Sequence, residues 1–187
     1  MKMSEKTNEN DLSEIQLGEP IPNEFDYSLS LSELDKQLTE KYELLNSEKK
    51  GAVTPEWVML GCALDLVDFA KENLDIELDF SEESLEKLQA VILMMRESYA
   101  EETPSDDIFA TWVNMTAGLL GCIIINNLGG SWIDSNAGMS VIVNGTAAFI
   151  TNQSVGVISG ANPNENAATE IYDFLKKQSG ISNTEES

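Results

Sequence analysis

The residue types able to do chemistry in this chain are mostly carboxylates, because histidine is absent and cysteine occurs only twice. Histidine is the commonest general base, so its absence excludes a Ser-His-Asp or Cys-His mechanism within this chain. Cys62 and Cys122 each follow a glycine in an apolar run, which predicts two buried free thiols. Two cysteines without histidine cannot complete a zinc site. We therefore expect a protein that is not an enzyme and that holds no metal or cofactor.

The acids of residues 75–86 have the spacing of a calcium-binding loop. Carboxylates fall at the first, third, fifth, ninth and twelfth places, where an EF-hand supplies oxygen ligands: Asp75, Glu77, Asp79, Glu83 and Glu86. The sixth place, which must turn sharply and is normally glycine, is Phe80. Apolar and acidic residues alternate strictly from 74 to 80, which is typical of a strand with one buried face. We favour the strand, and a calcium- or small-ligand-binding module is the alternative.

A second set of acids lies on one face of a predicted helix. Asp65, Asp68 and Glu72 are three and four residues apart, where like charges repel one another in a helix. Such a set is usually only the solvated face of an acidic protein, and the alternative is a patch that gives up stability to receive lysine and arginine side chains from a partner. The polar stretch at 126–132, which ends a predicted apolar helix, is most simply a helix stop beside a core tryptophan, and the alternative is a second corner that faces a partner. We assign partner binding to nine residues: Asp65, Asp68, Glu72, Asp75, Glu77, Asp79, Asn126, Asn127 and Trp132.

The overall charge favours a basic protein partner. The chain has 187 residues, with 33 acidic and 11 basic side chains, which gives a formal charge of −22. Such a surface repels nucleic acid and anionic membranes, since both are bound through lysine and arginine. It attracts a basic protein and speeds the encounter with it. The first ten residues are polar and lack the apolar core of a signal peptide, so we expect a cytoplasmic protein.

Helices must position the acids in the first half of the chain. An apolar stripe at helical spacing predicts a helix over 31–48, and Thr54-Pro55 supplies the cap and first residue of a second helix. Ser81, followed by two glutamates, is expected to cap a third helix that ends near Tyr99.

A fourth helix is predicted to begin at Pro104 and Ser105, and no residue from 108 to 133 is charged. That length would suffice to span a membrane. Its asparagines are costly in lipid, its glycines suit close helix contact, and no lysine or arginine flanks it, so we favour a central buried helix.

The rest of the chain is predicted to be rich in β-structure. Gly129-Gly130 end the fourth helix, and Asn144-Gly145 is typical of a two-residue hairpin turn. Three short strands are expected, at 132–133, 139–143 and 147–150. A short helix near 154–158 and a last helix capped by Asn162-Pro163 follow.

These elements predict one α+β domain over residues 29–178, with about five helices packed on a small antiparallel β-sheet. Residues 1–28 are polar and acidic, and we expect a flexible arm there. Residues 179–187 are expected to be a disordered tail. Residues 105–160 carry three acids and no base, which leaves a homodimer interface in this half open as an alternative.

Two segments carry a resemblance to a known kind of protein. Residues 119–132, Leu-Leu-Gly-Cys-Ile-Ile-Ile-Asn-Asn-Leu-Gly-Gly-Ser-Trp, and residues 78–85, Leu-Asp-Phe-Ser-Glu-Glu-Ser-Leu, resemble a family of small bacterial α+β domains of unknown function. The resemblance spans roughly residues 55 to 178 and implies a buried helix ending in Gly-Gly-x-Trp, a hairpin and a last helix. Such domains are similar in size and acidity to immunity proteins that neutralise bacterial toxins. The family commonly has a charged residue where this chain has Cys122 or Ile123.

The charge and the resemblance together predict a cytoplasmic acidic domain that binds a basic protein. An immunity protein that neutralises a bacterial toxin with its acidic surface is the specific form of this hypothesis. A structural or regulatory domain without catalysis is a further alternative.

Overall fold

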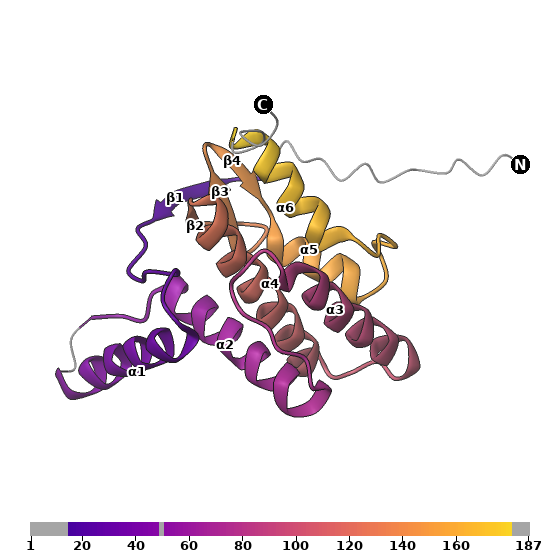
Figure 1. Cartoon of the computed structure of the whole chain (residues 1–187), viewed down its shortest axis with the longest axis horizontal. Helices are drawn as coiled ribbons and strands as arrows, with labels where there is room; N and C mark the ends of the chain where they lie inside the picture. Colours follow the sequence, from indigo (N-terminus) through magenta and orange to yellow (C-terminus); the bar gives the residue numbers. More distant parts are fainter. Residues whose placement is uncertain (1–14, 49–50, 181–187) are drawn as a thin grey trace, which may run out of the picture.

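The computed structural model describes residues 15–48 and 51–180, which form six helices and four strands (Figure 1). The helices are α1 (Leu31–Glu48), α2 (Pro55–Leu74), α3 (Ser84–Glu101), α4 (Asp106–Leu128), α5 (Ile150–Ile158) and α6 (Ala167–Gln178). The strands are β1 (Leu17–Ile21), β2 (Ser131–Ser135), β3 (Ser140–Val143) and β4 (Thr146–Ala148). The strands make one antiparallel sheet, so the predicted single-domain α+β fold is confirmed.

Helix α4 is the centre of the molecule. Figure 1 shows it passing through the middle, with α2 on one side and α3 on the other. The Ser105 hydroxyl caps its first turn, and every residue from Met115 to Ile125 is buried. Within the described ranges it is the one helix long and apolar enough to cross a membrane. Of its most apolar stretch of 18 residues, 67% is buried inside the fold. This burial agrees with the prediction of a central buried helix.

The sheet has the order β1-β2-β3-β4, and every neighbouring pair is antiparallel. Val143 and Thr146 pair across the last hairpin, with Asn144 and Gly145 as the two turn residues. Both turn residues have positive φ, at 47° and 81°, as a type I′ turn requires. The hairpin predicted from Asn144-Gly145 is therefore confirmed.

Strand β1 corrects the expectation of a flexible arm over residues 1–28. Ile21 pairs with Trp132 of β2, and the side chains of Phe25 and Tyr27 are each only 5% exposed. The segment is polar in sequence, but these few apolar side chains join the core and fix it in place. Residues 1–14 of the expected arm and residues 181–187 of the expected tail lie outside the described residues.

Residues 74–80 do not form the predicted strand. Burial alternates as expected, since Leu78 and Phe80 are each 4% exposed while Glu77 and Asp79 face solvent. However, none of the described strands pairs with this segment. It leaves α2 through a left-handed turn at Asp75, where φ is 55°, and packs on the helices. The alternation of apolar and acidic residues therefore predicts which side chains are buried, but it does not show that a strand buries them. Here the apolar side chains are buried against helices, with no pairing to a described strand.

Three helix starts differ from the prediction. The Ser81 hydroxyl donates to the Asp79 carboxylate instead of capping a helix, and α3 begins at Ser84. Helix α5 begins at Ile150, four residues before the predicted range. The Asn162 side chain accepts the Asn164 N–H at 3.1 Å, so Asn162-Pro163 forms a turn and α6 begins only at Ala167.

Candidate partner-binding groove

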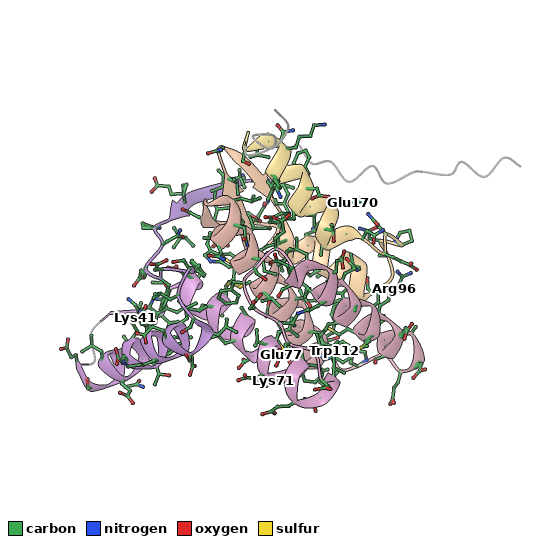
Figure 2. The ribbon with its side chains drawn as sticks, in the orientation of Figure 1. Lys41, Lys71, Glu77, Arg96, Trp112 and Glu170 are labelled. Atoms are coloured by element: carbon green, nitrogen blue, oxygen red, sulfur yellow. The ribbon has the colours of Figure 1, made fainter. Side chains whose placement is uncertain are left out.

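A groove of about 440 Å³ lies between α1, α2, the segment 77–79 and the start of α3. Its charged side chains come from all four elements: Asp35, Asp68, Lys71, Glu77, Asp79 and Lys87. Figure 2 shows Lys71 and Glu77 together at the end of α2. The fold thus brings Asp68, from the predicted helix patch, to the same groove as Glu77 and Asp79, from the predicted strand.

The floor of this groove is apolar. It is formed by Leu31 of α1, Leu64 and Val67 of α2, and Leu78 of the connecting segment. Val67 and Leu78 are 9% and 4% exposed, and the two other leucines are half-buried. An apolar centre within a charged rim is the composition of a typical protein-binding surface.

Helix α2 carries the acidic stripe along one edge of the groove. Each residue advances about 100° around a helix, so Asp68, Glu72 and Asp65 lie roughly 40°, 80° and 100° from Leu64. All three acids are exposed. Phe69, whose side chain is 38% exposed, lies beyond them on the same side. The negative surface therefore begins inside the groove and continues around α2 to an exposed aromatic ring.

Local hydrogen bonds occupy the carboxylate of Asp79. Its Oδ1 accepts the Ser81 N–H at 3.0 Å and the Ser84 hydroxyl at 2.6 Å. Burial opposes ionisation, but these donors together hold the pKa of Asp79 below its ordinary value. The Lys87 ammonium donates to the Glu77 carbonyl oxygen at 2.9 Å and fixes the same segment to α3. The side chains of residues 77–79 are therefore presented on a constrained backbone.

The calcium alternative gains no support from this geometry. In the part of the chain that the structure describes, no group of three or more aspartate, glutamate or cysteine side chains is placed to hold a metal ion. Asp79, the expected fifth-position ligand, is the carboxylate that the two serines engage.

The predicted corner at Asn126, Asn127 and Trp132 serves the fold. Both asparagine side chains donate to the Phe80 carbonyl oxygen, at 2.9 and 2.8 Å, and both are half-buried. Trp132 is completely buried, and its Nε1 donates to the Tyr27 hydroxyl at 3.0 Å. A partner cannot reach Trp132 in this fold, so its assignment to partner binding is wrong.

A buried carboxylate at the start of α2 is the polar group that sequence reasoning missed. Glu56 is completely buried, and its two oxygens accept the Tyr27 hydroxyl at 2.9 Å and the Glu24 N–H at 2.8 Å. Burial raises the pKa of Glu56 although these donors oppose the shift. Both donors lie about 30 residues earlier in the chain, so Glu56 resembles an ordinary first-turn glutamate in the sequence.

The groove residues Asp35, Lys71 and Lys87 were also missed. They lie on three different helices, and each is an ordinary exposed charge in its own helix. No local pattern marks them, because only helix packing brings them to one surface.

Comparisons with models of protein families, with curated protein sequences and with solved structures gave no match.

Proposed function

We propose that this chain is a cytoplasmic binding protein that docks a basic protein on its acidic face, made of Asp65, Asp68, Glu72, Asp75, Glu77 and Asp79. The observation that carries the proposal is the groove, in which Asp68, Glu77 and Asp79 line the same surface as the apolar floor. Carboxylates on separate segments provide charge for attraction, and the floor provides apolar area for affinity.

The energetics of this face favour association over stability. Asp68 follows Asp65 by three residues and precedes Glu72 by four, and each such like-charge pair costs a helix about 0.2–0.5 kcal/mol. A field of this sign raises the encounter rate with a basic protein by about 10- to 1,000-fold. The formal charge of −22 adds a long-range negative field to that of this face.

Neutralising a bacterial toxin is the task that we propose for this face. A toxin inhibitor must capture its target quickly, which suits a surface that increases the association rate. The resemblance of residues 78–85 and 119–132 to small bacterial domains that are similar to immunity proteins points in the same direction.

The experiment is to measure binding of the purified chain to basic toxins encoded beside its gene. We expect a complex whose association rate constant falls as salt rises from about 50 to 200 mM, because screening weakens attraction between exposed charges. The variant D65N/D68N/E72Q should lower that rate constant by about tenfold and flatten its salt dependence.

The matched control is E97Q/E101Q/E102Q, which removes the same charge from exposed residues at the far end of α3. It should change the rate constant much less than the α2 variant. Equal effects of the two variants would assign the attraction to net charge alone, and the absence of any complex would refute the toxin hypothesis.

A further inference from the structure

We infer that the segment bound in the groove is an amphipathic basic helix, which seats an apolar side chain on the floor and directs lysine or arginine toward Asp35 and Asp68. This inference rests on the proposed function and adds the shape and chemistry of the bound segment. Its first support is that Asp35 belongs to α1 and Asp68 to α2, so carboxylates line the groove from two different helices.

The charge of the groove is too mixed to hold a purely basic chain. Lys71 and Lys87 lie in the same lining as the four carboxylates and offset two of them. The Asp79 carboxylate is further engaged by Ser81 and Ser84. The lining stays net negative, but it attracts a polycation less than four carboxylates alone would, so the apolar floor must also contribute to affinity.

The neighbouring surface also has an amphipathic character. Phe69 is 38% exposed and lies four residues after Asp65 and three before Glu72, so the ring is exposed among acids. Aromatic residues are enriched at the centres of protein interfaces, while isolated acids are depleted there. A ligand with alternating apolar and basic faces matches this surface, and a ligand with charge alone leaves the ring and the floor uncovered.

A helix fits the groove better than an added strand. The lining comes from three helices and from the segment 77–79. In that segment the Glu77 carbonyl accepts from Lys87, and the Asp79 N–H donates to the Ser84 hydroxyl at 2.9 Å. These backbone groups are already engaged, so strand addition would lose the pairing on which it depends. Docking of an amphipathic helix uses side-chain contacts instead.

The test uses three synthetic peptides of about 14 residues and equal charge, added to the isotope-labelled full chain. The first is an amphipathic leucine-lysine helix, the second has the same composition in a scrambled order, and the third replaces leucine by serine. We expect the first to bind about tenfold more tightly than the others, with NMR shifts concentrated at Leu64, Val67 and Leu78. Equal affinities, or shifts elsewhere, would overturn the inference.

Two variants of α1 separate groove binding from general attraction. Leu31→Ser removes a floor side chain at the first residue of the helix, whereas Leu44→Ser removes a side chain that is 56% exposed and outside the groove. We expect Leu31→Ser to weaken the amphipathic peptide by about fivefold or more and Leu44→Ser to leave it unchanged. Thermal unfolding of both variants checks that α1 stays folded.

The same variants distinguish failure of this inference from failure of the proposed function. If the toxin complex depends on the acidic face but is insensitive to Leu31→Ser, the helix-in-groove mode is wrong and the acidic docking face stands. If D65N/D68N/E72Q has no effect on any complex, the proposed function itself is wrong.

Discussion

At the scale of single residues, two glycines allow α4 to lie in direct contact with its neighbours. A Cβ added at Gly118 would lie 2.6 Å from the Met59 carbonyl oxygen of α2. A Cβ added at Gly121 would lie 2.1 Å from the Trp132 ring. Both distances are far below van der Waals contact, so these positions accept no side chain larger than hydrogen without movement of the core.

Gly121→Ala should therefore destabilise the protein although alanine favours helices. Helix propensity alone would raise the free energy of unfolding by about 1 kcal/mol. Because the added methyl group must displace a completely buried tryptophan ring, the net effect should be a decrease of roughly 2–3 kcal/mol. Gly61→Ala in α2 is the matched control, since its added Cβ would lie 3.7 Å from Leu38 in ordinary contact. It should raise stability by about 0.5–1 kcal/mol in urea unfolding. Similar values for the two variants would contradict the packing of Trp132 on α4.

Glu56→Gln should change how stability depends on pH. Because burial raises the pKa of Glu56, the folded state holds its proton more tightly than the unfolded chain does. The resulting stabilisation is complete below the ordinary value of 4.5 and is lost as the pH rises through the folded value. Measurements can start at pH 5, which lies above the isoelectric point of about 4.1. Between pH 5 and pH 8, the excess of the wild-type free energy of unfolding over that of Glu56→Gln should be largest at pH 5 and should shrink toward pH 8. Urea titrations whose difference stays constant across this range would refute it.

At the scale of elements, the end of α4 holds the segment between α2 and α3 through one shared carbonyl. The Asn126 and Asn127 side chains both donate to the Phe80 oxygen, and Asn127 also donates to the Ile123 carbonyl at 2.8 Å. The segment has no β-ladder, so these amides and the buried side chains of Leu78 and Phe80 keep it in place. The position of the groove wall at 77–79 depends on this attachment.

Replacing both asparagines should cost more than the two single changes together. Either single alanine variant leaves the Phe80 oxygen with one donor and should cost about 0.5–1.5 kcal/mol. The double variant leaves that oxygen without a side-chain donor, so the coupling should be about 1 kcal/mol in a double-mutant cycle measured by urea unfolding. Asn73→Ala removes an exposed hydrogen bond from the Asn73 side-chain amide to the Phe69 carbonyl oxygen within α2. Its effect on stability should add independently to that of either α4 change. Strict additivity of the two α4 substitutions would show that the shared carbonyl is unimportant.

At the scale of the whole molecule, repulsion between carboxylates is largely uncompensated. The chain has 33 acidic and 11 basic residues. The described ranges contain three ion pairs, Lys36–Glu40, Lys41–Glu24 and Lys176–Glu82, and all of them are partly exposed. Pairs of this kind contribute at most about 1 kcal/mol each. The apolar core around α4 therefore stabilises a fold that its own charge weakens.

Added salt should accordingly raise the melting temperature. Between 10 and 150 mM sodium chloride the screening length falls from about 30 to 8 Å, which weakens repulsion between distant acids. We expect an increase of roughly 2–8 °C by calorimetry, since about 1 kcal/mol shifts the melting temperature of a domain of this size by 2–4 °C. Potassium chloride should give the same increase if screening is the cause. A melting temperature that falls or stays constant with either salt would show that self-repulsion is negligible.

The sequence predicted only some of the residues that line the candidate site. Asp68, Glu77 and Asp79 were recognised because their spacing is local, but their common groove and its apolar floor depend on how α1, α2 and α3 pack. Asp35, Lys71 and Lys87 gave no signal, since each is an unremarkable surface charge in its own helix. Trp132 was misassigned, because a tryptophan beside glycines has the same local pattern whether it is buried or exposed.

The sequence by itself determined the elements whose signals lie within a few residues. The bounds of α1, the Thr54-Pro55 start of α2, the buried α4 and the turn at Asn144-Gly145 all follow from local caps, periodicity and turn chemistry. Only the tertiary structure decided the pairing of β1 with β2, the path of residues 75–80, the burial of Glu56 and the composition of the groove. Their stabilising partners are remote in the chain, and a free energy that arises from such contacts leaves no local pattern.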